Sequence, residues 1–328
     1  MLQETRPWPI CRPSLPITNC KDQLCWVYTQ TLAPTDLEPA NYFGASIAFD
    51  GHTALIGSPS AVAGKEAVYV YERQPQGWVV RQKLSSGVTD GPTNFGRRVA
   101  LRGNVAAVTS LSGRPGAVYF FDRHEDGMWR LSTSLAPSDV AGLQFGFCLG
   151  LDYQRAIVGG NGGVAYVFRR TGSQWVVEQK FVSSEGGADS FGQSCDIEGD
   201  VAVVGAQNAR SDSADPNSLG AAYVFVRGAE GWKQYQKVRP TKDQPWTWFG
   251  SSVRLLHGVL GVGAAKSPIE SGGAVYVFEP VNGSFTDVLK FVYPEGQETE
   301  PQGIVTDGRT LIVSVQDGNR WLWNLLPQ

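Results

Sequence analysis

Residues 43–84 read FGASIAFDGHTALIGSPSAVAGKEAVYVYERQPQGWVVRQKL, and this stretch decides the fold. It contains four short apolar runs, SIAF, TALIG, AVYVY and WVVRQKL, which are separated by turn-forming residues. Asp50-Gly51 joins the first two runs, and Asp-Gly between apolar runs is the strongest short-range signal for a β-hairpin. We therefore predict four consecutive antiparallel strands in this segment.

The same unit recurs along the chain. Phe-Gly opens five units at intervals of 46 to 58 residues, and Gln-Gly takes the sixth position. Each unit continues with a third strand resembling AVYVF, and five units end in a fourth strand led by Trp or Phe. Self-similarity at such a period indicates an array whose neighbouring units bury one another's faces. The six openings are Phe43-Gly44, Phe95-Gly96, Phe145-Gly146, Phe191-Gly192, Phe249-Gly250 and Gln302-Gly303.

The sixth unit has three strands, and its missing fourth strand has a counterpart near the N-terminus. Trp26-Val-Tyr-Thr-Gln-Thr-Leu32 matches the fourth-strand pattern and precedes the first Phe-Gly. Pairing this segment with the last unit closes a ring and removes two free sheet edges. We therefore predict an all-β fold, a six-bladed β-propeller of four-stranded blades, closed by residues 26–32. Residues 1–25 form a Pro- and Cys-rich N-terminal segment, and residues 26–328 form the propeller.

The chain resembles the FG-GAP repeat family, the propeller repeats of integrin α-subunit heads and of many bacterial surface proteins. FGASIAFDGHTALIGSP and FGQSCDIEGDVAVVGAQ carry the Phe-Gly and Gly-Ala/Ser-Pro marks of that family, and GAVYVF with a Trp-led strand ending in QKL is similar to its bacterial branch. The resemblance covers residues 26–328. Integrin heads have seven blades, whereas the repeats here number six, so their binding geometry does not transfer directly.

Composition narrows the partners and the compartment. The net charge of −3 and the pI near 5.7 provide no basic field for nucleic acid, and no apolar run is long enough for a membrane span. The N-terminus lacks the apolar region of a signal peptide, so the protein is either cytosolic or a mature chain whose signal was removed. Cys11, Cys20 and Cys25 cluster in the N-terminal segment, either as reduced thiols or as partners in a disulfide. We favour an extracellular, cell-surface or periplasmic location.

No catalytic or metal site emerges from the residue types. Calcium-binding relatives carry an acidic loop between the first two strands, as the resemblance implies, but the corresponding turns here are too short to wrap an ion. His52, His124 and His257 belong to separate turns on one rim, so they cannot converge on zinc or serve a nucleophile. Cys148 and Cys195 lie at offsets 3 and 4 from their Phe, which favours two core thiols over a disulfide or a metal pair. We predict no cofactor and no enzyme activity.

The opposite rim, which carries the loops from fourth to first strands and from second to third strands, holds the candidate ligand site. Each unit places an acid five to seven residues before its opening dipeptide. These acids either cap their own turns or form an acidic ring that faces a cationic partner or a shared ion. They are Asp36, Asp90, Asp139, Glu185, Asp243 and Glu295.

Aromatic residues and one long loop add to this rim. The tryptophans of QPWTWFG either stack on a sugar or a protein partner or pack between blades. The loop 206–220 is long and polar, which is typical of recognition loops, although a solvated loop is the alternative. Arg97, Arg98 and Arg254 begin inner strands, and we expect them to pair with the acidic loops. The candidate ligand-binding residues are Tyr42, Trp246, Trp248, Arg210, Asp212 and Asp215.

These features predict a binding protein. The leading hypothesis is a module for protein–protein recognition or adhesion through the loop rim. The alternative is a lectin-like propeller that binds carbohydrate, and the third reading is an enzyme with a site in the central channel. These functional readings rest on analogy at the level of the fold.

Overall fold

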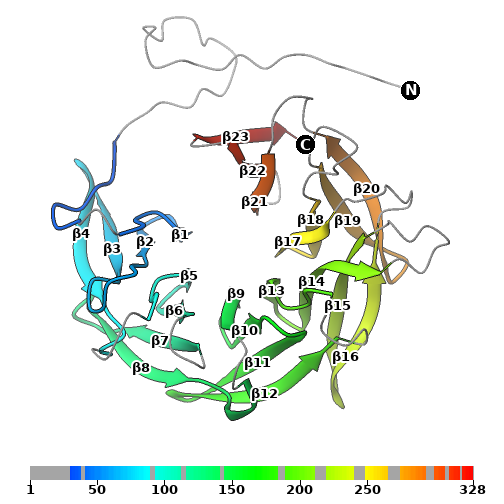
Figure 1. Cartoon of the computed structure of the whole chain (residues 1–328), viewed down its shortest axis with the longest axis horizontal. Helices are drawn as coiled ribbons and strands as arrows, with labels where there is room; N and C mark the ends of the chain where they lie inside the picture. Colours follow the sequence, from blue (N-terminus) through cyan, green and yellow to red (C-terminus); the bar gives the residue numbers. More distant parts are fainter. Residues whose placement is uncertain are drawn as a thin grey trace, which may run out of the picture.

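In the computed structural model, the described residues are 30–37, 41–88, 93–111, 116–140, 144–183, 189–210, 219–239, 248–264, 274–292, 299–306, 310–317 and 320–327, and side chains are described up to residue 288. They form antiparallel sheets that stand around a common axis (Figure 1). Within these residues, five sheets have four strands, and β21–β23 form a sheet of three; one parallel pairing, Gly220 with Phe249, links the fourth and fifth sheets. The predicted all-β fold is confirmed.

Within each sheet the strands follow one another in sequence order from the ring axis outward. The first strands are β1 (Ser46–Phe49), β5 (Arg98–Arg102), β9 (Phe145–Leu151), β13 (Ser194–Glu198), β17 (Phe249–Leu256) and β21 (Thr299–Thr306). The second strands are β2 (Thr53–Ser58), β6 (Val105–Ser110), β10 (Arg155–Gly160), β14 (Val201–Arg210), β18 (Val259–Ala264) and β22 (Thr310–Asp317). The third strands are β3 (Ala67–Gln74), β7 (Ala117–Arg123), β11 (Val164–Thr171), β15 (Leu219–Gly228), β19 (Ala274–Val281) and β23 (Arg320–Pro327). The fourth strands are β4 (Gly77–Leu84), β8 (Trp129–Leu135), β12 (Gln174–Val182), β16 (Gly231–Val238) and β20 (Ser284–Val292).

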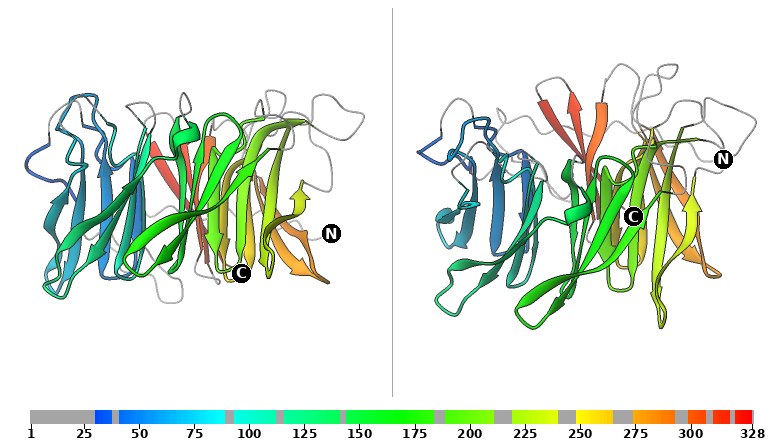
Figure 2. Two further views of the ribbon diagram at one scale, coloured as in Figure 1. Left: turned by 90° about the horizontal axis from the view of Figure 1, so that it is seen from below. Right: turned by 60° about the horizontal axis from the view of Figure 1, so that its bottom comes forward.

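The connections gather at two opposite rims (Figure 2). The loop rim carries the connections from fourth to first strands and from second to third strands, such as residues 59–66. It also carries the short 3₁₀ helix Ser138–Val140. The hairpin rim carries the tight turns between first and second strands and between third and fourth strands, such as residues 50–52. This is the division of loops that the repeat predicts.

The core lies between neighbouring sheets, as the apolar character of both faces of the third strands predicts. Phe95, which opens the second sheet, is fully buried, and its ring packs edge-on against Tyr119 at 5.2 Å between centroids. The cluster around it combines Leu55 and Val68 of the first sheet with Val99 and Phe121 of the second. Equivalent edge-on pairs are Phe43–Tyr69, Phe145–Tyr166, Phe191–Tyr223 and Phe249–Tyr276.

Glycines allow the sheets to approach closely near the ring axis. An ideal Cβ on Gly205 of β14 would lie 2.1 Å from the carbonyl oxygen of Gly250, the glycine of the next Phe-Gly. Gly57 and Gly159 stand in the same relation to Gly96 and Gly192. At these three interfaces a glycine of the second strand and the glycine of the next Phe-Gly therefore touch, where no side chain fits.

One prediction about this interface is wrong: Cys148 and Cys195 form a disulfide, with their Cα atoms 5.5 Å apart. Offsets that differ by one do point to opposite faces of a strand. However, neighbouring sheets stack face to back, so the side chain at offset 3 of one sheet meets the side chain at offset 4 of the next. The Ser46 hydroxyl confirms this geometry, because it donates to the Gly96 carbonyl of the next sheet at 2.8 Å.

A glutamine clamp joins the outer edges of neighbouring sheets. The Gln82 side chain of β4 accepts a hydrogen bond from the Trp129 backbone N–H and donates one to the Trp129 carbonyl, both at 2.8 Å. Just before this glutamine, β4 carries a β-bulge in its pairing with β3. The bulge turns the strand and presents the next side chain to the neighbouring sheet. The same two bonds join Gln179 to Trp232 and Gln236 to Phe285.

Candidate functional site

Two aromatic side chains mark the loop rim. Tyr42 and Trp248 each precede a Phe-Gly dipeptide, and their side chains are 67% and 37% exposed. The backbone of Trp248 has a φ of +42°, and Asn94 and Ser190 at the same repeat position have φ values of +54° and +61°. Asparagine tolerates this left-handed region, whereas a bulky residue is seldom found there. Trp248 is therefore held in a costly conformation that presents part of its indole to solvent.

The two rim acids that the structure describes are both bonded within their own sheets. The Asp36 carboxylate accepts hydrogen bonds from the Tyr69 hydroxyl at 2.8 Å and from the Lys83 ammonium at 2.7 Å. The hydrogen bond from Lys83 lowers the pKa of Asp36 below its usual value, and the one from Tyr69 adds to the effect. These contacts neutralise the carboxylate while leaving about half of the side chain exposed.

Asp139 repeats this arrangement in the third sheet, where its carboxylate accepts from Tyr166 and Lys180, both at 2.6 Å. The bond from Lys180 likewise lowers the pKa of Asp139. The Tyr and Lys partners occupy repeated positions in the third and fourth strands. The acid that precedes Phe-Gly is therefore a structural element of both repeats. A further role in ligand binding stays a prediction.

Most of the remaining predicted ligand residues lie outside the described residues. Arg210 is described; it ends β14, and its carbonyl accepts a hydrogen bond from the Arg239 guanidinium. The structure thus brings Tyr42, Trp248, Asp36 and Asp139 to one rim. The sequence-predicted residues outside the described part are Trp246, Asp212, Asp215, Asp90, Glu185, Asp243 and Glu295.

The inner strands hold charged residues whose partners were predicted incorrectly or not predicted. The Arg254 guanidinium lies 3.5 Å from the carboxylate of Asp196, which belongs to the inner strand β13 and not to a rim loop. Asp196 is buried, and its carboxylate accepts from the backbone N–H groups of Leu255 at 2.8 Å and Ile197 at 3.0 Å. Burial raises the pKa of Asp196, while Arg254 opposes that shift. The sequence offered no signal for Asp196 beyond an acid within an apolar strand.

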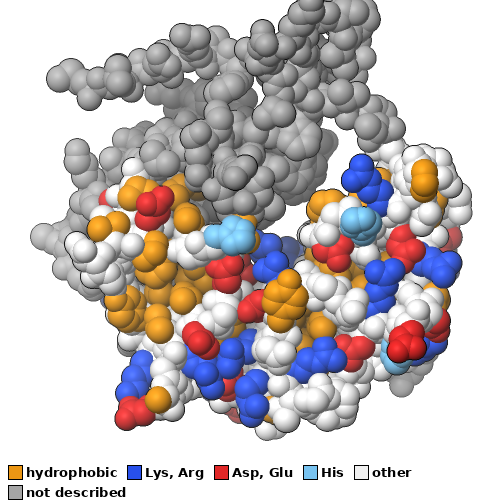
Figure 3. Space-filling view, turned by 180° about the vertical axis from the view of Figure 1, so that it is seen from behind, with side chains coloured by type: hydrophobic (Ala, Val, Ile, Leu, Met, Phe, Trp, Pro, Cys, Tyr) orange, Lys and Arg blue, Asp and Glu red, His pale blue; other side chains and the backbone are white. Residues whose placement is uncertain are grey.

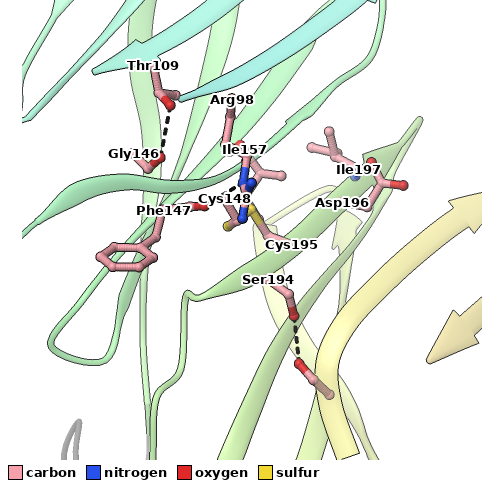
Figure 4. The surroundings of a disulfide bond; sticks show 11 residues. Arg98, Thr109, Gly146, Phe147, Cys148, Ile157, Ser194, Cys195, Asp196 and Ile197 are labelled. Atoms are coloured by element: carbon pink, nitrogen blue, oxygen red, sulfur yellow. Dashed lines mark hydrogen bonds between the residues drawn. A yellow bond between two sulfur atoms is a disulfide. The ribbon is translucent and has the colours of Figure 1, made fainter. Parts of the chain in front are cut away.

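Arg98 of β5 has no carboxylate partner among the described residues. Its Nε donates to the carbonyl of Phe147 at 3.0 Å in the next sheet (Figure 4). Burial, with the neighbouring charge of Arg97 as the second cause, lowers the pKa of Arg98 to about 10. The equivalent positions of the other sheets hold the small residues Ser46, Cys148, Ser194 and Ser252.

The hairpin rim is built for cohesion between sheets. Charges of both signs alternate across this face, and the histidine side chains lie apart from one another (Figure 3). Glu178 pairs with Arg155 at 2.9 Å in its own sheet and with Arg227 at 3.1 Å in the next. Arg123 similarly reaches back to Glu72 at 2.6 Å. These ion pairs link neighbouring sheets at the hairpin rim.

The described residues contain no group of three or more His, Cys, Asp or Glu side chains that could hold a metal ion. They also contain no helix with the length and apolar character of a membrane span.

Comparison with known structures supports the fold. A protein from Bacteroides uniformis ATCC 8492 that carries the provisional name 6-phosphogluconolactonase is 13% identical; the match covers 85% of this chain and 80% of that one, with a TM-score of 0.58. A protein of the same provisional name from Bacteroides fragilis NCTC 9343 gives 12% identity, coverage of 87% and 80%, and a TM-score of 0.57. The computationally designed Ika8 protein is 12% identical to this chain. That match covers 86% of this chain and 70% of the designed one, with a TM-score of 0.54. At such identities the likeness shows a propeller-like fold and nothing of function.

Comparison of sequences points to one family. No curated protein sequence matches the chain. Residues 26–71 and 175–225 match the model of the FG-GAP repeat, and these regions include the first and fourth Phe-Gly openings. The remaining openings recur at the same structural position, at or just before the inner strand of each four-stranded sheet. Two regions of the chain are therefore similar to the FG-GAP repeat.

Proposed function

We propose that this protein is a non-catalytic interaction module that recognises a protein partner through its loop rim. The observation that carries the proposal is the pair of exposed aromatic side chains, Tyr42 and Trp248, at equivalent positions on that rim. Exposed aromatic residues on a rigid scaffold are frequent anchors of protein interfaces. The strained backbone of Trp248 is maintained by the surrounding sheet, as is common at binding sites.

Carbohydrate binding is the second candidate, because a partly exposed indole can also stack on a sugar ring. An enzyme with a site at the ring axis is the third reading. The lactonase-named structures are 12–13% identical to this chain, so they support that reading only through the fold.

The deciding experiment uses Trp248→Ala and Tyr42→Ala, with Tyr153→Ala as the matched control. Tyr153 is 64% exposed and lies on the hairpin rim. Proteins captured from the native cell surface are identified and purified, and their dissociation constants are measured for the four chains; a glycan array is probed in parallel. We expect the rim variants to weaken protein binding at least tenfold and the control to bind normally. Equal affinities for all four chains would refute a rim site, and array signals that vanish in Trp248→Ala would favour the lectin.

We also propose that six blades close the ring, with residues 26–32 as the fourth strand of the last blade. Gln30 supports this, because its side-chain amide bonds the backbone N–H and carbonyl of Trp78, both at 2.8 Å, as Gln82 bonds Trp129. Residue 30 thus holds the clamp position of a fourth strand that precedes the first sheet. Ile47 and Phe49 are 59% and 58% exposed on the face that the β21–β23 sheet would cover.

We place the protein outside the cytoplasm. The Cys148–Cys195 disulfide joins two sheets and supports this location, because disulfides persist chiefly in oxidising compartments. Fractionation of the native cells with an antibody against the chain tests it. Recovery of the protein in the cytosol alone would contradict the proposal.

A further inference from the structure

Glu66 is an acidic residue buried at the junction of the first and second sheets, next to the loop rim. It ends the loop 59–66, directly before β3, and it is 3% exposed. One carboxylate oxygen, Oε1, accepts hydrogen bonds from the Thr93 backbone N–H at 2.9 Å and from the Thr93 hydroxyl at 2.8 Å. The other oxygen, Oε2, is buried and has no hydrogen-bond partner among the described residues. The second sheet therefore satisfies only one half of this carboxylate.

This carboxylate also lacks a described counter-charge. No described Lys, Arg or His nitrogen lies within 4.0 Å of Glu66. Other acids that are shielded from solvent are compensated: Glu178 lies 2.9 Å from an arginine, and both oxygens of Asp189 accept hydrogen bonds. Buried charges in proteins are paired with an opposite charge or bind a metal ion. Glu66 therefore calls for a positive partner at Oε2.

The repeat does not require an acid at this position. In the other four-stranded sheets, the residue before the AVYVF-like run of the third strand is glycine. An ideal Cβ on Gly116 would lie 2.0 Å from the carbonyl oxygen of Phe145, so this position faces the closely packed opening of the next sheet. A residue that departs from such a rule and also buries a charge indicates a specific role. The glycines are Gly116, Gly163, Gly220 and Gly273.

The surroundings of Glu66 supply further oxygen atoms. The Thr93 hydroxyl contacts the carboxylate directly. Tyr119 belongs to the apolar cluster of the same junction. Burial raises the pKa of Tyr119, and the negative charge of Glu66 adds to this shift, so the two side chains share one environment. Carboxylate and hydroxyl oxygens are ligands that hard cations prefer.

The charge of the site selects the class of cation. One carboxylate balances one positive charge, whereas a divalent ion would leave an uncompensated charge in a buried place. We infer that Glu66 binds a monovalent metal cation, sodium or potassium, between the first and second sheets. The ion holds the end of loop 59–66, and the start of this loop supports Tyr42, whose N–H donates to the Pro59 carbonyl at 3.0 Å. This inference does not depend on the identity of the partner that the rim binds.

The test compares melting temperatures of the full chain in NaCl, KCl, CaCl₂ and choline chloride at equal ionic strength. Choline is the reference cation, because its bulky ammonium group cannot take oxygen ligands at metal distances. We expect NaCl or KCl to raise the melting temperature of the wild type by about 2 °C or more over choline chloride, for an ion at about ten times its dissociation constant. Glu66→Gln should melt at one temperature in all four salts. Broadening of the sodium-23 NMR line by the wild type should likewise vanish in this variant.

Glu72→Gln is the matched control, because Glu72 is a poorly exposed acid of the same sheet that pairs with Arg123 at 2.6 Å. It should keep the wild-type response to NaCl and KCl. If Glu66→Gln fails to fold, Glu66→Gly decides the matter, since the other sheets carry glycine at this position. Equal melting temperatures of the wild type in the four salts, or the same salt response in the wild type and the Glu66 variant, would overturn the inference. Stabilisation by CaCl₂ alone would also overturn it, because the bound ion would then be divalent.

Discussion

Replacing Gln82 with alanine should loosen the junction between the first and second sheets. Gln82 follows the bulge of β4 and holds the Trp129 backbone through one accepted and one donated hydrogen bond, both at 2.8 Å. These bonds satisfy an N–H and a carbonyl on the outer edge strand of the second sheet. The substitution leaves both groups without the side-chain partner that covers this edge.

The expected cost follows from the two bonds. A typical intramolecular hydrogen bond contributes a net of about 0.5 to 1.5 kcal/mol to stability, so the pair contributes about 2 kcal/mol. Trp129 itself is 2% exposed, so the surrounding packing limits how well water can replace the lost amide. The predicted fall in the free energy of unfolding is therefore about 2 kcal/mol.

Urea unfolding, followed by tryptophan fluorescence, measures this change. Gln74→Ala is the matched control, because Gln74 is an exposed residue of the same sheet with no described side-chain bond, and its replacement should cost less than about 0.5 kcal/mol. Equal unfolding free energies for Gln82→Ala, Gln74→Ala and the wild type would refute the clamp as a source of stability.

Three further predictions concern the interfaces between sheets. The double variant Cys148→Ser and Cys195→Ser should have a free energy of unfolding about 4 kcal/mol lower, as the chain-entropy relation gives for a sequence separation of 47 residues. Denaturant titration checks this, and an unchanged unfolding midpoint would contradict it. Gly205→Ala should lower the free energy of unfolding by more than about 2 kcal/mol, because the added Cβ would lie 2.1 Å from the Gly250 carbonyl oxygen. Calorimetry measures the melting temperature of the variant, and a value equal to that of the wild type would contradict the close contact. Burial raises the folded-state pKa of Asp196 above its unfolded value, so the wild type loses stability as the pH rises from about 4. Asp196→Asn lacks this titrating group, so its stability relative to the wild type should increase over the same pH range. Unfolding measured at several pH values tests this, and a constant difference would contradict it.

The repeat predicted most of the fold, because a residue that recurs at the same position of each repeat has the same structural role in each sheet. Phe95 and its equivalents fill the interfaces, and Trp129 begins a fourth strand, as the alignment of repeats indicates. The disulfide was not predicted, because the alternation of side chains along a single strand was applied to Cys148 and Cys195, which belong to two different, stacked sheets. The glutamine clamp had a sequence signal, a Gln four residues after the leading aromatic, but the bulge that aims it depends on pairing with β3.

The site was less predictable than the fold. The loop rim follows from the repeat. Trp248 differs from its equivalents, which marked it as a candidate, but the sequence left open whether its indole is exposed or packs between blades. The partners of Asp36 were not predicted, because Tyr69 and Lys83 come from strands 33 and 47 residues away. The isolation of Arg98 likewise depends on which groups reach the ring axis, and a linear pattern of residues does not specify that.

Closure of the ring is the central claim, and hydrogen–deuterium exchange of the full chain tests it most directly. Residues 26–32 and 320–327 should both exchange slowly, at rates comparable with residues 67–84 of β3 and β4, because the proposed pairing protects their backbone amides. In Gln30→Ala, protection of residues 26–32 should fall while β3 remains protected. Exchange of residues 26–32 at the rate of an unstructured peptide in the wild type, with β3 and β4 protected, would contradict the account.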